Sequence, residues 1–387
     1  MSKSLTLGID ASNIRSGGGL SHLTCLMEAG KPEKYHIGRI VIWGGRQILE
    51  RLPRRRMIER VHVPLLDKTL LVRMAWQRWL LPWHLNKQKC GALFSPGGIS
   101  PKHVLIPSIV MSQNLLPFEP KERDRFVAHS FMRFKIRLIE QNQRRSMEQA
   151  NGLIFLTNYA RDIVTTALKC RPKRLAVIPH GIEQRFFSPP RRACPVSEFT
   201  KTRPFHLLYV SIVDVYKHQW QVAEAVVVLH GKGVPVEIDF IGPAYGPAMK
   251  LLNAVIKRHD VSGEFLHYRG PLPFSELHKV YRKADGFIFA SSCENLPVIL
   301  LEAMAAGLPI ACSRRGPMPE ILGDAGIYFD PERPEEITAA LSELINQAEL
   351  RRQLAERAFQ YAKSYSWERC ADETFLYISE VAHKGKV

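Results

Sequence analysis

The chain has 387 residues and a net charge of +17, with 45% hydrophobic and 24% charged residues. These values are ordinary for a globular protein, so they exclude extended disorder and fibrous repeats, and the length predicts two domains. Seven scattered cysteines, none spaced C-x-x-C, disfavour a disulfide framework or a zinc site and fit a reducing compartment. We expect neither a signal peptide nor a membrane-spanning helix, because long uncharged apolar runs are missing.

Short apolar runs, typical of buried parallel strands, alternate with helical patterns along the first half of the chain. A glycine-rich stretch, Gly17–Gly19, follows the first run, and a helix is expected from Leu20; a longer helical pattern covers about 121–150. The predicted strands are 4–10, 39–44, 92–95, 103–111 and 152–157.

A proline-rich, aperiodic stretch over 184–204 interrupts this alternation, which then restarts. Strands are predicted at 205–213, 236–242, 265–270, 286–291, 309–313 and 326–330, and helices at 219–229, 249–259, 274–284 and, as a pair, 334–362. The pattern predicts an α/β protein with two Rossmann-like, doubly wound parallel-sheet domains facing a central cleft. We assign residues 1–190 to the first domain, 191–204 to a linker, 205–366 to the second domain, and 367–387 to a C-terminal helix that could pack back on the first domain.

Two carboxylates stand out after the predicted strand 286–291. Glu294 lies in the following loop and Glu302 on the apolar helix after it. Free N–H groups at the start of such a helix suit a phosphate or a sugar hydroxyl. The same spacing recurs at Glu335 and Glu343 on a charged helix, so only the strand–loop–helix context distinguishes 294 and 302. The alternative for Glu302 is a core carboxylate paired with an arginine.

Several segments of the chain resemble the motifs of one known family and occur in the same order as in that family. Residues 268–331 resemble the donor-binding half of retaining GT-B glycosyltransferases of the GT4 type, known as glycosyl transferases group 1. Segments 8–23, 178–186 and 207–220 are similar to that family's glycine-rich loop, end-of-first-domain signature and donor-phosphate loop. The resemblance implies the GT-B fold and a sugar transferase (EC 2.4 class).

The resemblance also implies roles for individual residues. Glu294 would contact hydroxyls of the transferred sugar near the reacting centre, and Lys217 would neutralise the diphosphate leaving group. Glu302 would bind the nucleotide ribose. The other donor-binding candidates are Ser211, Gly270, Pro271, Leu272, Asn295, Leu296, Pro297 and Val298. Gly18 and Gly19 would let the backbone approach the diphosphate or the acceptor, and the acceptor-side candidates are Gln113, Asn114 and His180.

The chain departs from the family pattern at two places. Ile212 stands where the family usually has an arginine, for which Arg314 or Arg315 could substitute. Gln113 and Asn114 stand where it often has His and Asp, and an amide cannot act as a general base. No Asp-x-Asp occurs, so we expect no metal and no cofactor. The glycine stretch could also be a plain loop, and His180 a turn residue.

The excess of positive over negative charge lies entirely in the first half of the chain. Residues 1–190 hold 31 Lys and Arg against 13 Asp and Glu, whereas the remainder is almost neutral. This asymmetry favours an anionic partner, although it could also serve solubility. Within 67–89, the candidate membrane-contact residues are Trp76, Trp79, Trp83, Arg73 and Arg78. The alternative is an internal helix, and nucleic acid is disfavoured because no strand interleaves basic and aromatic residues.

The sequence therefore predicts a retaining, metal-independent glycosyltransferase that uses a nucleotide sugar. We expect a lipid-linked or phosphorylated glycan acceptor, peripheral attachment to the anionic inner face of the cytoplasmic membrane, and a role in bacterial O-antigen, lipopolysaccharide or capsule assembly. Two alternatives stay open: a sugar-nucleotide epimerase of the same fold, and an inactive sugar-nucleotide-binding scaffold. The donor base and sugar, the acceptor and the linkage are not decided by the sequence.

Overall fold

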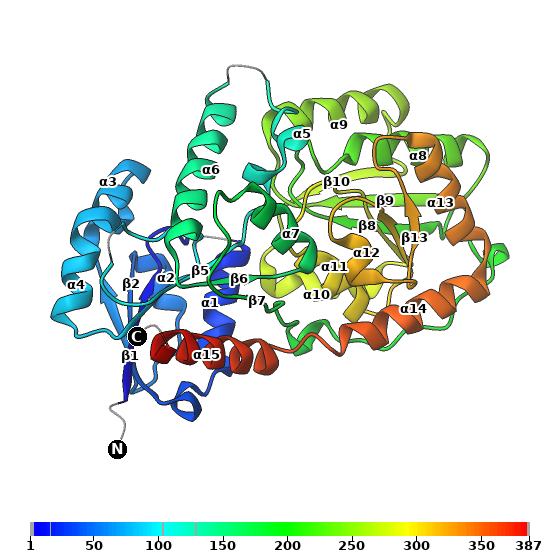
Figure 1. The fold of residues 1–387 in the computed structure, drawn as a ribbon. Helices are drawn as coiled ribbons and strands as arrows, with labels where there is room; N and C mark the ends of the chain where they lie inside the picture. The colour runs from blue at the N-terminus through cyan, green and yellow to red at the C-terminus, as the bar shows by residue number, and fades with distance from the viewer. Residues whose placement is uncertain (1–3, 16, 103, 128–129, 385–387) are drawn as a thin grey trace. The chain divides into compact units, whose positions relative to one another are not determined.

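The computed structural model describes residues 4–15, 17–102, 104–127 and 130–384. The chain forms two compact units (Figure 1). Unit 2 consists of Asp124–Phe126 and Ile182–Tyr365. Unit 1 consists of the chain up to Arg123, Val127–Gly181 and the C-terminal segment from Ser366. No helix in the described parts of the chain is both long and apolar enough to cross a membrane.

Unit 1 is built on a seven-stranded parallel sheet of order β3-β2-β1-β4-β5-β6-β7. The chain winds outward from β1 in one direction as far as β3 and then returns to β4 on the other side of β1. The loops after β1 and β4 therefore flank the switch point of this sheet, where ligands bind in open α/β folds. The strands are β1 (Leu5–Asp10), β2 (Ile37–Gly44), β3 (Ile58–His62), β4 (Ala92–Ser95), β5 (Ser108–Met111), β6 (Gly152–Phe155) and β7 (Leu175–Val177).

Helices cover both faces of this sheet, and the C-terminal helix is one of them. Ser379 on that helix donates a hydrogen bond of 2.9 Å to the carbonyl of Tyr35, which ties the end of the chain to unit 1. The α-helices are α1 (Gly18–Ala29), α2 (Arg46–Arg51), α3 (Leu70–Ala75), α4 (Leu81–Lys87), α5 (Pro120–Arg123), α6 (Phe131–Gln149), α7 (Asn158–Ala167) and α15 (Trp367–Lys384). A π-helical turn, η3 (Trp76–Leu80), joins α3 to α4, and the 3-10 turns are η1 (Pro32–Tyr35), η2 (Pro64–Asp67) and η4 (Leu116–Phe118).

Several expectations for unit 1 need correction. The run 103–111 is a strand only from Ser108, and its first residue, His103, lies outside the described residues. The pattern over 121–150 is not one helix, since Ser130 starts α6 by accepting a hydrogen bond from the amide of Arg133. Strands β3 and β7 were not predicted. They are the two edge strands and are only partly buried, so their sequences lack the apolar runs of the central strands.

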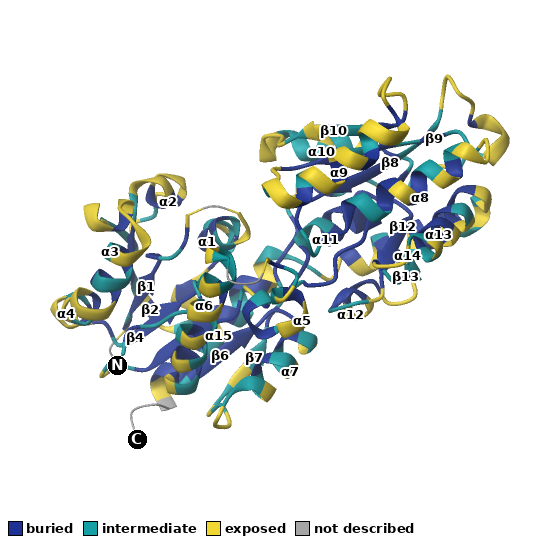
Figure 2. Ribbon diagram, turned by 90° about the horizontal axis from the view of Figure 1, so that it is seen from above, coloured by how far each residue is buried: buried dark blue, intermediate teal, exposed yellow. Residues whose placement is uncertain are grey.

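Unit 2 is built on a six-stranded parallel sheet of order β10-β9-β8-β11-β12-β13. Its strands are β8 (Phe205–Val210), β9 (Val236–Ile241), β10 (Leu266–Gly270), β11 (Gly286–Phe289), β12 (Ile310–Ser313) and β13 (Ile327–Phe329). Its helices are α8 (Gln219–Gly231), α9 (Gly246–His259), α10 (Phe274–Lys283), α11 (Val298–Ala305), α12 (Met318–Leu322), α13 (Pro334–Asn346) and α14 (Ala348–Ala362). In both units the central strands are buried and the outer helix faces are exposed (Figure 2).

The proline-rich stretch between the sheets is not a free tether. Only two short 3-10 turns interrupt it, η5 (Gln184–Phe186) and η6 (Val196–Glu198), as its aperiodic sequence predicts. It is nevertheless packed on unit 2: the amide of Ser188 donates to the carbonyl of Ala305 at 2.9 Å, and the Phe186 ring meets the Tyr281 ring edge-on at 5.8 Å. The continuous part of unit 2 begins at Ile182, whereas the predicted first domain extends to residue 190.

The tryptophan-rich segment 67–89 places some of its side chains in the core and others on the surface. Trp76 is 2% exposed and packs in a core cluster with Trp43, Leu81 and Leu85, so the prediction that it contacts a membrane is wrong. Arg73 is also buried and donates to the carbonyl of Ser12 at 3.2 Å, so it too is excluded. The π-helical turn explains the split, because it adds a residue to the turn and rotates the following side chains relative to α3.

Replacement of Trp76 by alanine is expected to destabilise unit 1 by about 3–5 kcal/mol, because it empties a core position. Replacement of Trp79, which is 66% exposed, is expected to change stability by no more than about 0.5 kcal/mol. Denaturant unfolding of the two variants checks this. Equal destabilisation by both substitutions would contradict the assignment of Trp76 to the core and Trp79 to the surface.

Candidate active site

The switch point of the unit 2 sheet lies between β8 and β11. The loops that follow these two strands, 211–218 and 290–297, leave the same edge of the sheet because all its strands are parallel. The first loop contains Lys217, and the second contains Glu294 and leads into α11. The topology thus brings together two residues that are 77 positions apart in the sequence.

Backbone and side-chain hydrogen bonds fix the two loops to each other. The amide of Ser292 donates to the carbonyl of Tyr216 at 2.9 Å. The Tyr209 hydroxyl on β8 donates to the carbonyl of Lys217 at 2.5 Å and accepts from the amide of Ala290 at 3.2 Å. Lys217 is therefore held from both loops, which favours a preorganised site over a flexible surface lysine.

Lys217 and Glu294 form an ion pair at this point. Their side chains are only 6% and 14% exposed, and the Lys217 ammonium also lies 5.3 Å from the centre of the Phe289 ring. A nearly buried pair of this kind satisfies both charges within the protein. An anionic ligand would offer the lysine a second partner, while the carboxylate could accept hydrogen bonds from hydroxyl groups.

Helix α11 begins beside this pair. Asn295, Leu296 and Pro297 are all buried just ahead of it, and Pro297 occupies the N-cap. Val298 is the first helical residue. The start of the helix presents a partial positive charge, which complements Lys217 in attracting an anion. Four of the donor-binding candidates thus occupy the loop and helix start that the sequence indicated.

Glu302 lies further along α11 and is fully enclosed. It accepts a hydrogen bond from the Tyr281 hydroxyl at 3.0 Å. Burial is the main reason that the pKa of Glu302 is raised to about 8; Glu183 acts in the same direction, while the Tyr281 hydrogen bond and Arg185 act in the opposite direction. The partner of this carboxyl is thus a tyrosine rather than the arginine of the core alternative. No sequence pattern pointed to Tyr281.

The remaining donor candidates follow β8 and β10. A Cβ on Gly242, directly after β9, would meet the carbonyl oxygen of Ser211 at 2.1 Å. The loops after β8 and β9 therefore approach each other as closely as glycine allows. The Gly242 amide also donates to the carbonyl of Gly270 at 2.9 Å, and Gly270 has a φ of +72°. Pro271 and Leu272 are exposed beyond it.

The chain's departures from the family pattern have structural consequences. Ile212 is 38% exposed. The two arginines considered as substitutes are already paired: Arg314 with Glu336 and Arg315 with Asp330, each at 2.7 Å. Neither is therefore a spare cation at the switch point.

His218 is a site residue that the sequence analysis missed. It is buried at the N-cap of α8 with a φ of +55°, and its Nε2 lies 3.0 Å from the Ser292 hydroxyl. Burial lowers the pKa of His218 to about 3, and the positive charges of Arg125 and Arg315 act in the same direction. The imidazole is therefore neutral. The one sequence feature that could have indicated His218 is its position directly after Lys217.

The acceptor-side candidates of unit 1 are only partly brought together. A Cβ on Gly19 would lie 3.0 Å from the Gln113 side-chain oxygen, so these two are neighbours. Gly18 faces open space, and Asn114 is exposed, its side chain accepting from the amide of Leu116 at 3.2 Å. His180 is only 4% exposed and stacks on His22 at 4.4 Å, so the prediction that it contacts an acceptor is wrong.

Comparison with known proteins agrees with this geometry. Residues 194–361 match the family model "Glycosyl transferases group 1". The Escherichia coli O-antigen chain mannosyltransferase B is 27% identical over 258 residues, which cover 62% of this chain and 63% of that protein. The chain therefore spans less than two thirds of that relative's length.

Solved structures match over nearly the whole chain. Sucrose-phosphate synthase from Thermosynechococcus elongatus has a TM-score of 0.75 at 13% identity and covers 98% of this chain and 100% of its own. Anabaena HepE, crystallised in complex with UDP, has a TM-score of 0.69 at 15% identity and covers 97% and 100%. The fold is therefore GT-B. The match to the glycosyl transferases group 1 family lies within unit 2, and it supports the predicted resemblance to GT4-type glycosyltransferases.

The raised pKa of Glu302 predicts a pH dependence of stability. The native carboxyl stays protonated up to about pH 8, whereas in the unfolded chain it ionises near its ordinary value of 4.5. Its contribution to stability is therefore lost as the pH rises between these values, by at most about 1.4 kcal/mol per pH unit. Glu302→Gln should remove this slope.

Thermal unfolding of the two proteins between about pH 5 and 8 measures the effect. Glu343→Gln, on the exposed face of α13, serves as the control, because it changes the same residue type without altering a buried group. An identical pH slope in the wild type and the Glu302 variant would contradict a protonated Glu302.

Proposed function

We propose that this protein is a retaining glycosyltransferase that moves a sugar from a nucleotide diphosphate donor bound in unit 2 to a glycan acceptor. The single observation that carries this proposal is the Lys217–Glu294 ion pair at the switch point of the unit 2 sheet, beside the start of α11. It combines a cation for a diphosphate, a carboxylate for sugar hydroxyls and a helix N-terminus in one place.

In the proposed reaction, an acceptor hydroxyl oxygen forms a bond to the anomeric carbon as the bond from that carbon to the diphosphate breaks. Attack on the face from which the diphosphate leaves gives retention, and a diphosphate oxygen takes the hydroxyl proton. Lys217 stabilises the charge that develops on the leaving diphosphate. Glu294 orients the sugar through its hydroxyls, and Glu302 binds the ribose of the nucleotide.

We propose that the reaction needs no metal ion. Lys217 and the N-terminus of α11 supply positive charge at the place where a divalent cation would otherwise neutralise the diphosphate. The donor is proposed to be a nucleotide sugar, in keeping with the UDP bound by HepE.

For the acceptor we propose a lipid-linked or phosphorylated glycan of bacterial O-antigen, lipopolysaccharide or capsule assembly. The O-antigen mannosyltransferase relative and the positive charge of the first half support this choice. The exposed Trp79, Trp83 and Arg78 support peripheral attachment at the cytoplasmic face of an anionic membrane. Trp76 and Arg73 are not part of that surface.

Thermal shift measurements with UDP-, GDP-, ADP- and CMP-sugars, with and without EDTA, test the donor site. One nucleotide class is expected to raise the unfolding midpoint regardless of EDTA, because binding to the folded state alone stabilises it. A shift that disappears with EDTA would contradict metal independence. A protein stabilised by none of the four classes would contradict a donor site in unit 2.

Glu294→Gln and Lys217→Met test the proposed chemistry. With the donor that gives the thermal shift, each substitution is expected to lower the transfer rate by about a hundredfold or more, since it removes a charge at the reacting centre. Glu343→Gln is the matched control, because Glu335 and Glu343 repeat the spacing of Glu294 and Glu302 on an exposed helix. Transfer at the wild-type rate by Glu294→Gln would refute the assigned role.

A further inference from the structure

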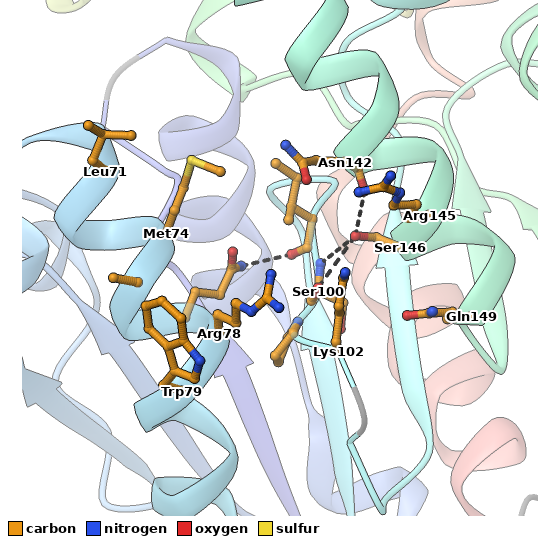
Figure 3. Close-up of a pocket in the computed structure, with 14 residues that line it drawn as sticks. Leu71, Met74, Arg78, Trp79, Ser100, Lys102, Asn142, Arg145, Ser146 and Gln149 are labelled. Carbon is orange, nitrogen blue, oxygen red and sulfur yellow. Dashed lines mark hydrogen bonds between the residues drawn. The ribbon is translucent and has the colours of Figure 1, made fainter.

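A pocket of about 260 Å³ opens in unit 1, between the α3–η3 segment and α6 (Figure 3). The loop after β4 closes it with Ile99, Ser100, Pro101 and Lys102. That loop flanks the switch point of the unit 1 sheet, which is the edge of an open α/β sheet where ligands bind. None of the donor, catalytic or acceptor-side candidates lines this pocket.

The lining of this pocket is cationic. Arg78, Lys102 and Arg145 line it from three different segments, and no aspartate or glutamate lines it. None of the three forms an ion pair with any residue that the structure describes; Arg78 only lies against the Trp79 ring, 5.6 Å from its centre. Three unneutralised cations around one concavity favour a multiply charged anion such as a phosphate monoester or a diphosphate.

Hydrogen bonds hold the floor of the pocket in place. Ser146 on α6 donates to the carbonyl of Asn142 at 2.8 Å and accepts from the amide of Ser100 at 3.1 Å. On the opposite side, the Gln77 amide donates to the carbonyl of Ile99 at 3.0 Å and to the buried carboxylate of Asp10 at the end of β1. The loop after β4 is thus attached to both walls, and the pocket is preformed.

An apolar surface continues from the cationic pocket. Phe131, Leu138 and Arg145 follow one another at seven-residue intervals on α6 and therefore share one face of the helix. Phe131 and Leu138 are exposed. On the other wall, Leu71 is 77% exposed and lines the pocket directly, next to the exposed Trp79. Exposed apolar side chains that border a charged pocket match an amphipathic ligand.

We propose that this pocket binds the phosphate headgroup of a lipid-linked acceptor, with the lipid chain lying on the apolar surface beside it. The proposal rests on the proposed function, whose acceptor it specifies as a lipid phosphate. The cations Arg78, Lys102 and Arg145 hold the headgroup, and Leu71, Trp79, Phe131 and Leu138 contact the chain. Free phosphate would use only the first set of contacts.

Equilibrium binding of three probes to the full chain tests this: dodecyl phosphate below its critical micelle concentration, inorganic phosphate, and dodecanol. Dodecyl phosphate is expected to bind tightest, because each methylene buried on the apolar surface adds roughly fourfold to the affinity. Binding no tighter than inorganic phosphate would overturn the lipid assignment. Equal binding of dodecanol would overturn the headgroup assignment.

The variant R78Q/K102Q/R145Q separates the pocket from the overall charge of unit 1. It is expected to weaken dodecyl phosphate binding by about a hundredfold. The control R54Q/R56Q/R171Q removes the same charge from exposed positions outside the pocket and should bind like the wild type. Equal weakening by both variants would overturn the site.

Trp79→Ala should weaken dodecyl phosphate but leave inorganic phosphate binding unchanged. An unchanged affinity for dodecyl phosphate would overturn the apolar half of the site. None of these measurements requires sugar transfer. Loss of probe binding with intact donor binding therefore contradicts this site alone, whereas an absent nucleotide-sugar shift contradicts the proposed function.

Discussion

The constraint on which both units depend is that every strand of their sheets is parallel. Parallel neighbours need crossover connections, so all loops that follow strands emerge at one edge. In each sheet the order of the strands reverses at the first strand, between β1 and β4 in unit 1 and between β8 and β11 in unit 2. That reversal leaves two loops side by side with no crossover helix between them. Lys217 meets Glu294 at one of these places, and at the other the loop after β4 contributes Ile99–Lys102 to the cationic pocket.

The cations of the two sites differ in whether they have carboxylate partners. In unit 2 the cations around the switch point have carboxylate partners: Lys217 pairs with Glu294, Arg314 with Glu336 and Arg315 with Asp330. A ligand there exchanges one partner for another, which suits a diphosphate that must leave after the reaction. In unit 1 the pocket cations have no carboxylate among the lining residues. Arg78, Lys102 and Arg145 contribute three of the positive charges of the basic first half of the sequence.

The sequence predicted the parts of this protein that rest on buried strands and on loops directly after them. Continuous apolar runs revealed the central strands of both sheets, and the position of Glu294 after such a run indicated the site. The edge strands β3 and β7 of unit 1 were not predicted, because they are partly exposed and their sequences contain no continuous apolar run. Trp76 was misjudged because helical spacing assumes a regular α-helix, whereas a π-helical turn redirects the side chains after it. No sequence pattern indicated Tyr281, and only the position after Lys217 marked His218, since their contacts are with residues 21 and 74 positions away.

The sequence around Glu302 predicts that this carboxyl is buried, but its protonation state depends on its surroundings in the structure. The apolar helix around it predicted burial, and burial in turn shifts the carboxyl toward its protonated form. A protonated Glu302 beside Tyr281 places no net charge in the core of unit 2, so the helix can stay apolar on all sides without an ion pair. Ligand hydroxyls that donate to the carboxylate would favour its ionised form instead. Binding of such a ligand would then be coupled to release of a proton, and its affinity would rise with pH up to the native pKa of about 8.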